Sequence, residues 1–462
     1  MAVGGAGTHW SNSKPRSRRR WRRRFGYGAL TLLLAGGIFY AALRYHWRHE
    51  FRHHVEAIRA MGYPVTLAEL DAWYLWPSGS ENAAFWILEA AGRYHDPADT
   101  NDGWDLWFLV RDSPSGSTAP LDDRRRALLD QHIAANAEPL KLLHEAATMK
   151  ESRYPIDLKD FKGPSSHHTS VTQACALLSV EAVQHVEGAN APDAVRSLVA
   201  ALAVADSLAR EPLLLAQFNR VHCQSLALSA LERTINRTRL TDEQLASLSQ
   251  AVRQAGRPEA WMRALVGFRC GLLEYCGHPE GLDLKRPASL VVGGFRTLGL
   301  LDRGGVIFLK LMDESLAVRQ LPAHERMTAA RALNGKWQDA LHTFFRIHES
   351  TSAVVEDTKE ELTELAQLTV ALTALAIEQY RLSHGQLPTC LDDLIPAYLP
   401  DVPQDPFDGR PLRYRLREPG FIVYSIGPDE TDDGGKPRRP ARGSQGGEAS
   451  RIEYDMTFIV ER

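Results

Sequence analysis

Residues 192–209 read PDAVRSLVAALAVADSLA, and this stretch decides the class of fold. Its apolar side chains recur every three or four residues, whereas Asp193, Arg196 and Asp206 fall between them. This spacing is typical of an amphipathic helix with one buried face. The same pattern of helix, short break and helix extends from about residue 51 to 349. We therefore expect a mainly helical protein with an irregular body of antiparallel helix hairpins.

Local signals mark the ends of these helices. The preceding helix, at about 169–187, is expected to end at Gly188, because glycine often follows the last residue of a helix. Thr241 and Gln244 form a capping box, which predicts another helix start. In the Gly-rich segment 291–311 we expect a buried hairpin around Gly304-Gly305, because charged side chains such as Arg296, Asp302 and Arg303 argue against a second membrane span.

The composition argues against several classes of protein. The chain has 462 residues, of which 44% are apolar and 24% charged, close to the values of soluble globular proteins. Residues 1–24 contain one Lys, seven Arg and no acidic residue, which leaves 46 basic against 57 acidic residues elsewhere, a net charge of −11. An acidic body argues against nucleic-acid binding, so we expect the membrane and other proteins as partners.

The N-terminal region predicts that the protein is targeted to a membrane. After the basic leader at 1–24, residues 25–43 are uncharged, and 19 helical residues just span a hydrocarbon core of ~30 Å. Because basic flanks stay in the cytoplasm, we expect a transmembrane anchor at 25–43 of a single-pass protein in the bacterial inner (cytoplasmic) membrane, with its bulk in the periplasm. A cleaved secretory signal is the competing interpretation, although Ala41-Ala42-Leu43 does not match the usual cleavage site.

Two short patterns contain metal-binding residue types. His49-Glu50-Phe51-Arg52-His53 reads H-E-x-x-H and resembles zinc metallopeptidases, in which two imidazoles on one helix face hold zinc and the glutamate activates water. A solvated helix just outside the membrane is the alternative interpretation. His167-His168 begins a predicted helix and either binds a metal or is a polar entry segment. Beyond these patterns we recognise no catalytic motif, and we expect a protein that is not an enzyme.

The last hundred residues predict a different architecture. A helix runs from about residue 360 and stops at His384-Gly385. A short helix at 391–397 follows, and strand-like runs occupy 412–416, 421–426 and 453–460. One long helix packed on a small antiparallel sheet is an α+β module.

The predicted domain boundary lies just before this module. We place a helical domain at 50–350 and the module at 355–462. The acidic pairs Glu356-Asp357 and Glu360-Glu361 occupy adjacent turns of the same helix, so we expect them on a solvated face.

Three motifs follow one another in the module. They are Tyr380-x4-Gly385-x2-Pro388-Thr389, then Asp405-Pro406-Phe407-x-Gly409-x-Pro411-x2-Tyr414, then Tyr424-Ser425-x-Gly427-x-Asp429 with Asp432-Asp433. This order resembles the C-terminal globular domain of the major pseudopilin of type II secretion. The resemblance covers about residues 360–462, less than a quarter of the chain.

The resemblance implies a calcium site in the loop after the second strand, with Asp429, Asp432 and Asp433 as carboxylate ligands. A solvated acidic turn is the alternative, in which the following basic side chains neutralise the acids without metal. Those side chains are Lys436, Arg438, Arg439 and Arg442.

The chain also departs from a pseudopilin. The start of its membrane segment, Phe25-Gly26-Tyr27-Gly28-Ala29-Leu30, lacks the glutamate of a prepilin-peptidase site, and some 300 residues separate this segment from the module. We therefore expect a protein that does not polymerise. The leading hypothesis is a membrane-anchored, extracytoplasmic interaction or scaffold protein beside a type II secretion-like or envelope machine. The alternatives are a helix-pair scaffold unrelated to secretion and a membrane-tethered zinc hydrolase using His49 and His53.

Overall fold

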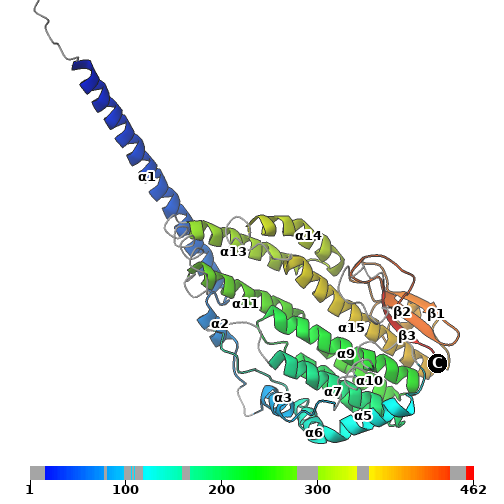
Figure 1. The fold of residues 1–462 in the computed structure, drawn as a ribbon. Helices are drawn as coiled ribbons and strands as arrows, with labels where there is room; N and C mark the ends of the chain where they lie inside the picture. The colour runs from blue at the N-terminus through cyan, green and yellow to red at the C-terminus, as the bar shows by residue number, and fades with distance from the viewer. Residues whose placement is uncertain are drawn as a thin grey trace, which may run out of the picture.

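A long N-terminal helix projects from a mainly helical body, and a small sheet lies at the end of the body away from that helix (Figure 1). The computed structural model describes residues 16–77, 81–97, 106, 109, 118–158, 167–277, 300–340, 353–437 and 454–462, with backbone alone at 16–23, 275–277, 300–301 and 353. The predicted fold class, mainly α with an N-terminal apolar helix and a small antiparallel C-terminal sheet, is confirmed.

The helices in chain order are α1 (Arg16–Ala60), α2 (Leu67–Trp73), α3 (Ala83–Gly92), α5 (Asp123–Ala135), α6 (Ala137–Ala146), α7 (His167–Glu187), α8 (Ala191–Asp206), α9 (Leu214–Arg237), α10 (Asp242–Ala255), α11 (Pro258–Gly277), α13 (Leu300–Val318), α14 (Ala323–Ala340) and α15 (Ala353–His384). A 3-10 turn, η3 (Leu391–Leu394), replaces the short helix expected at 391–397. The strands are β1 (Arg413–Leu416), β2 (Phe421–Ser425) and β3 (Met456–Val460).

The stretch that decided the fold class forms α8, which packs against α7 and α9. The Asn190 side chain caps its start by accepting a hydrogen bond from the backbone N–H of Asp193. Helix α7 ends at Glu187, directly before Gly188, as expected, and the left-handed residue of the turn that follows is Ala189, at φ 56°. The capping box of Thr241 and Gln244 is confirmed at the start of α10.

Helix α1 joins the body through α13. Helix α13 runs straight through Gly304-Gly305, so the hairpin expected there is wrong. The glycine instead permits close packing, since a Cβ at Gly305 would lie 2.6 Å from the Phe51 ring of α1. An ion pair between Lys310 and Glu50, 2.7 Å long, lies beside this contact, and Ile58 is buried in the core formed by α11, α13 and α14. The C-terminal part of α1 is therefore part of the body.

The N-terminal part of α1 has no such contacts. Every described side chain from 24 to 43 is exposed. Within the part of the chain that the structure describes, α1 is the one helix long and apolar enough to cross a membrane. Residues 1–15 of the predicted basic leader lie outside the described residues.

The C-terminal sheet has the strand order β1-β2-β3, with both pairs antiparallel. Tyr414 lies opposite Val423, and Val423 lies opposite Phe458. The turn between β1 and β2 requires Gly420, at φ +91°, because a Cβ there would lie 1.8 Å from the carbonyl oxygen of Val460. Helix α15 packs on β2 and β3, and α9 also contacts β3.

One hydrophobic core continues from the helical body into the C-terminal module. Leu178 of α7, Leu375 of α15 and Val423 of β2 belong to the same buried cluster. Residues 341–352, which include the end of the predicted helical domain, lie outside the described residues. Because α15 contributes to the core of both parts, removal of residues 360–462 would expose the apolar face of the helical body.

The acidic residues at the start of α15 are not all solvated, so that expectation is wrong for two of them. Asp357 and Glu361 are buried, whereas Glu356 is exposed and Glu360 is half-buried. Glu361 pairs with Arg319 and, at 2.9 Å, with Arg326. These arginines hold α14 and the end of α13 against α15.

Replacement of Asp357 by Asn should make folding stability less dependent on pH. Burial, opposed in part by the Arg319 guanidinium, raises the pKa of Asp357 to about 7. Between about pH 4 and 7 the folded chain keeps a proton that the unfolded chain has released, so rising pH lowers stability in this range. Asp357→Asn should therefore stabilise the protein by about 2–4 kcal/mol more at pH 8 than at pH 4.

Denaturant unfolding of the detergent-solubilised protein, followed by circular dichroism at both pH values, measures this difference. Glu356→Gln is the matched control, because Glu356 is exposed on the same turn of α15. Equal effects of Asp357→Asn at the two pH values would contradict the assignment of a protonated Asp357.

Candidate functional site

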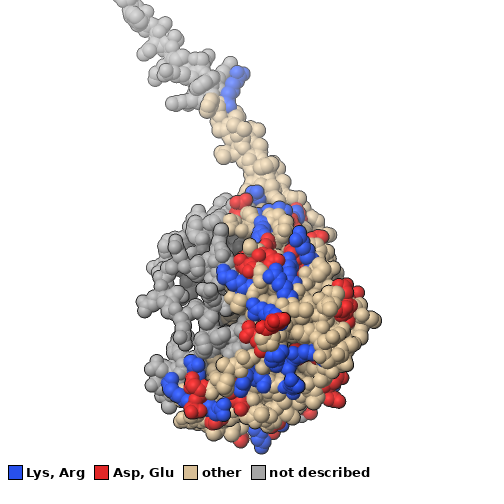
Figure 2. Space-filling model, turned by 90° about the vertical axis from the view of Figure 1, so that its right-hand side faces the viewer, with Lys and Arg blue, Asp and Glu red and all other residues tan. Residues whose placement is uncertain are grey.

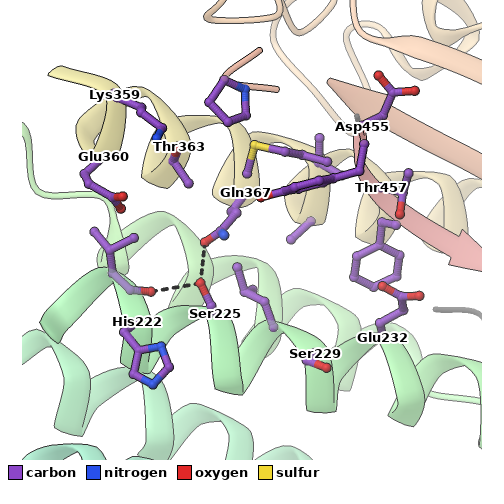
Figure 3. A pocket seen from close by; sticks show the side chains of 18 of the residues that line it. His222, Ser225, Ser229, Glu232, Lys359, Glu360, Thr363, Gln367, Asp455 and Thr457 are labelled. Atoms are coloured by element: carbon purple, nitrogen blue, oxygen red, sulfur yellow. Dashed lines mark hydrogen bonds between the residues drawn. The ribbon is translucent and has the colours of Figure 1, made fainter. Parts of the chain in front are cut away.

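A groove lies between α9, α15 and β3, and we name it the α9–α15 groove (Figure 3). It encloses a cavity of about 480 Å³. Helix α9 contributes Val221, Ser225 and Ser229, which recur every four residues and therefore share one helix face. Thr363 and Gln367 have the same spacing on α15. A third part of the wall comes from Pro428 in the loop after β2 and from β3 with the residues before it, which are Tyr454, Asp455, Met456, Thr457 and Phe458.

The groove combines polar walls with an apolar floor. The Ser225 hydroxyl bridges the two helices, since it lies 2.9 Å from the Gln367 side-chain oxygen and 3.0 Å from the carbonyl oxygen of Val221. Phe218, Leu228, Val370, Ala371 and Phe458 form apolar parts of the lining. Apolar surface with a few fixed polar groups is typical of a binding site. The sequence analysis did not identify this site, although small polar side chains at four-residue spacing within apolar helices were a usable signal.

Two acidic groups at the edge of the groove have raised pKa values because they are partly buried. They are Glu360 on α15 and Asp455 next to β3. The Asp455 carboxylate also accepts hydrogen bonds from the backbone N–H groups of Asp433, Gly435 and Lys436. Asp455 thereby ties the loop after β2 to the strand that lines the groove.

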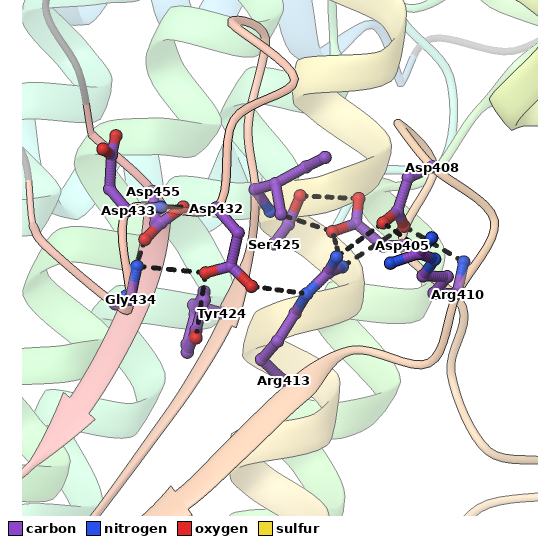
Figure 4. A network of polar contacts seen from close by, with 12 residues as sticks. Asp405, Asp408, Arg410, Arg413, Tyr424, Ser425, Asp432, Asp433, Gly434 and Asp455 are labelled. Carbon is purple, nitrogen blue, oxygen red and sulfur yellow. Dashed lines mark hydrogen bonds and ion pairs between the residues drawn. The ribbon is translucent and has the colours of Figure 1, made fainter.

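A buried polar network beside the sheet is centred on Asp405 (Figure 4). Asp405 is fully buried, and it accepts hydrogen bonds from the backbone N–H groups of Phe407 and Ile426 and from the Ser425 hydroxyl, at 2.8–3.0 Å. The Arg413 guanidinium lies 2.7 Å from the same carboxylate. Asp405 therefore fixes the turn before β1 against the end of β2.

Arg413 links this network to the acidic loop. Its guanidinium pairs with Asp408 at 2.5 Å and with Asp432 at 3.5 Å. Although burial disfavours the charged form of Asp408, hydrogen bonds from Arg413 and from the backbone of Arg410 lower the pKa of that carboxyl. Asp432 also accepts hydrogen bonds from the Tyr424 hydroxyl and the Gly434 backbone. The network centred on Asp405 and Arg413 thus stabilises the turn before β1 and the loop after β2.

The carboxylates predicted to bind calcium do not share one site among the described residues. Asp432 pairs with Arg413, and Asp429 accepts a hydrogen bond from the backbone of Thr431. The backbone of Asp433 donates to Asp455, and the buried Oδ2 of its carboxylate has no hydrogen-bond partner among the described residues. These three side chains do not gather as a group of metal-ligating atoms there, whereas calcium needs six to eight oxygen ligands. Arg438, Arg439 and Arg442, the predicted neutralising residues, lie outside the described part of the chain.

The H-E-x-x-H residues lie on α1 close to the body. His49 and His53 are exposed, and the His49 ring stacks on Tyr45. Glu50, the predicted water-activating residue, instead pairs with Lys310 of α13, whose hydrogen bond lowers the pKa of Glu50 despite the opposing effect of burial. No described third ligand joins the two imidazoles in a metal-binding group. The structure therefore offers no zinc centre at this position within the described residues.

Comparison with known proteins gives no family assignment. We find no match to this chain among protein-family models, curated proteins or solved structures. The resemblance of residues 360–462 to a pseudopilin domain stays a prediction, and function is inferred below from the packing, burial and charge of the described residues.

Asp405→Asn should destabilise the protein by about 2–4 kcal/mol, because the variant removes the buried charge that pairs with the half-buried Arg413. Urea unfolding measures the loss. Asp401→Asn, at an exposed position four residues earlier, is the control and should change stability by less than about 0.5 kcal/mol. An Asp405→Asn variant as stable as the parent would show that the network does not hold the sheet.

Calcium should not stabilise the protein. If Asp429, Asp432 and Asp433 bound the ion, millimolar CaCl2 would raise the unfolding temperature, and Asp429→Asn would abolish the increase. The pairing of Asp432 with Arg413 leads us to expect the same unfolding temperature with CaCl2 and with EGTA. An increase that Asp429→Asn removes would restore the calcium site that the pseudopilin resemblance implies.

Proposed function

We propose that this chain is a single-pass membrane-anchored scaffold protein that binds a protein partner outside the cytoplasm through the α9–α15 groove and the adjoining C-terminal module. One observation carries the proposal. The apolar segment of α1 is exposed throughout residues 24–43, whereas the same helix is packed into the body by Phe51 and Ile58.

The exposed segment supports an anchor. Leu32, Leu33, Ile38 and Phe39 each expose 70–75% of their surface. Figure 2 shows an uncharged stretch of α1 between a basic group near its start and the charged surface of the body. A continuous apolar surface of this size is unfavourable in water and favourable in a lipid bilayer. Helix α1 also continues without a break through Leu43 to its end at Ala60, which favours an anchor over a cleaved signal.

The charge around the anchor supports an orientation. Eight basic residues precede the apolar segment, and basic flanks favour the cytoplasmic side of a membrane. We place the N-terminus in the cytoplasm and the body in the periplasm of a bacterium. Because the sheet lies at the end of the body away from α1 (Figure 1), the C-terminal module is then presented away from the membrane.

The groove supports protein binding. It is formed by helices that also build the core, so it is fixed in shape before a partner arrives, which lowers the entropic cost of binding. The pseudopilin resemblance next to it favours a component of a secretion-like or envelope machine as the partner. The core shared between module and body favours the second candidate, a scaffold unrelated to secretion, because a pseudopilin joins its module directly to the membrane helix.

Site-specific crosslinking in intact membranes tests the partner site. A photo-reactive amino acid at Thr363, in the groove, should capture a partner protein that can be identified after purification. The same amino acid at Ser383, exposed near the other end of α15, is the control and should capture at least about tenfold less of that partner. Deletion of residues 360–462 is unsuitable, because it removes part of the core.

Thr363→Arg provides a second readout, because a long charged side chain would fill the groove. It should abolish capture from a photo-reactive group at Ser229 on the facing helix, with unchanged unfolding temperature. Equal capture from Thr363 and Ser383 would contradict the groove as the binding site. Capture of pseudopilins or secretion-platform subunits would support the first candidate, and capture of unrelated envelope proteins the second.

A further inference from the structure

Three buried side chains from distant parts of the sequence converge at the start of α7. The Nε2 atom of His167 lies 2.8 Å from one carboxylate oxygen of Glu211, and the Nε2 atom of His168 lies 2.8 Å from the other. His167 is 6% exposed, His168 4% and Glu211 0%. The interpretation of His167-His168 as a polar entry segment is therefore wrong, because both imidazoles are inside the protein.

These are metal-ligating groups at metal-binding distances. One nitrogen from each imidazole and one oxygen of Glu211 lie within 4.8 Å of one another. In a tetrahedral site with bonds of 2.0–2.1 Å, neighbouring ligand atoms are about 3.3 Å apart. Each imidazole nitrogen would need to move about 0.5 Å away from its carboxylate oxygen to admit an ion of this kind. Among the described residues, this is the group of three such side chains that meets the distance requirement.

The surroundings hold His167 and the connection that carries Glu211 in place, whereas the Nδ1 atom of His168 is buried without a hydrogen-bond partner among the described residues. The fully buried Tyr154 ring stacks on His167, with ring centres 4.5 Å apart, and its hydroxyl lies 2.7 Å from that of Ser207. The Gln217 side chain donates a hydrogen bond to the backbone oxygen of Glu211, which fixes the α8–α9 connection. A Cβ at Gly267 of α11 would lie 1.8 Å from the carbonyl oxygen of Pro212. Glycine at this position therefore allows α11 to pack closely against the α8–α9 connection.

The charge of the cluster also favours a cation. A buried carboxylate is costly unless a positive charge or hydrogen-bond donors compensate it. The described contacts of the Glu211 side chain are the two imidazoles, and no described Arg or Lys forms an ion pair with it. An ion bound to all three groups would replace the hydrogen bonds from the imidazoles and supply a positive charge next to the buried carboxylate.

We propose that His167, His168 and Glu211 bind a divalent first-row transition metal ion through both Nε2 atoms and the carboxylate, with zinc as the best fit. Imidazole and carboxylate together suit zinc, whereas calcium and magnesium favour all-oxygen sites. Because the ligands are closed off from solvent, the ion has a structural role. It clamps the start of α7 to the α8–α9 connection. This inference does not depend on the proposed partner site, because it concerns the purified protein alone.

Metal analysis of the full-length protein, purified in detergent without a His tag, tests the site. After removal of metal with EDTA, zinc titration should show one ion bound per chain and raise the unfolding temperature by several degrees. Cobalt added in place of zinc should give a visible absorption spectrum that reports nitrogen and oxygen ligation. This spectrum belongs to the parent protein, so it stays informative if a variant fails to fold.

Variants locate the ion. His168→Gln should weaken zinc binding at least about 100-fold, because one of three protein ligands is lost. The matched control is the double variant His49→Ala, His53→Ala, which removes the H-E-x-x-H imidazoles and should leave stoichiometry and affinity unchanged. Failure of the parent protein to bind zinc or cobalt would overturn the proposal. Loss of the ion in the control with retention in His168→Gln would overturn it equally.

Discussion

Three buried carboxylates on α15 hold the other elements to this one helix. Glu361 pairs with Arg319 and Arg326, at the end of α13 and the start of α14. One turn further, Glu364 pairs with Arg220 of α9 at 2.7 Å and accepts a hydrogen bond from Trp261 of α11. Breaking a buried ion pair of this kind costs about 3–5 kcal/mol, a large part of the stability of a typical domain.

The opposite end of α15 repeats the arrangement. Glu378 lies 2.6 Å from both Arg381 of the same helix and Arg462 at the C-terminus. The helix thereby fixes α13 and α14 near its start and the residues after β3 near its end. The α9–α15 groove depends on the same constraint, because the Arg220–Glu364 pair sets the two helices that form its walls at a fixed separation. The packing of the helices and the α9–α15 groove are therefore stabilised by the same contacts.

Local patterns predicted many elements of the fold. The periodicity of α8, the capping box at Thr241 and the strand-like runs near the C-terminus act within a few residues, and each was confirmed. The burial of Asp357 and Glu361 could not be predicted in this way. Acidic residues on adjacent helix turns have the same spacing whether water or arginine surrounds them, and Arg220 is 144 residues distant from Glu364 in the sequence. Only tertiary packing brings such partners together.

The two candidate zinc patterns also show that local spacing alone does not predict a metal site. H-E-x-x-H satisfies the spacing rule for zinc, yet its imidazoles are exposed. Its glutamate, Glu50, forms an ion pair with Lys310, 260 residues later. His167-His168 matches no catalytic motif, because its third ligand, Glu211, follows 43 residues after His168, beyond the end of α8. Local spacing establishes that two ligands can face one way. Burial and a third converging ligand decide whether an ion can be held. In this chain they favour His167-His168 over the H-E-x-x-H motif.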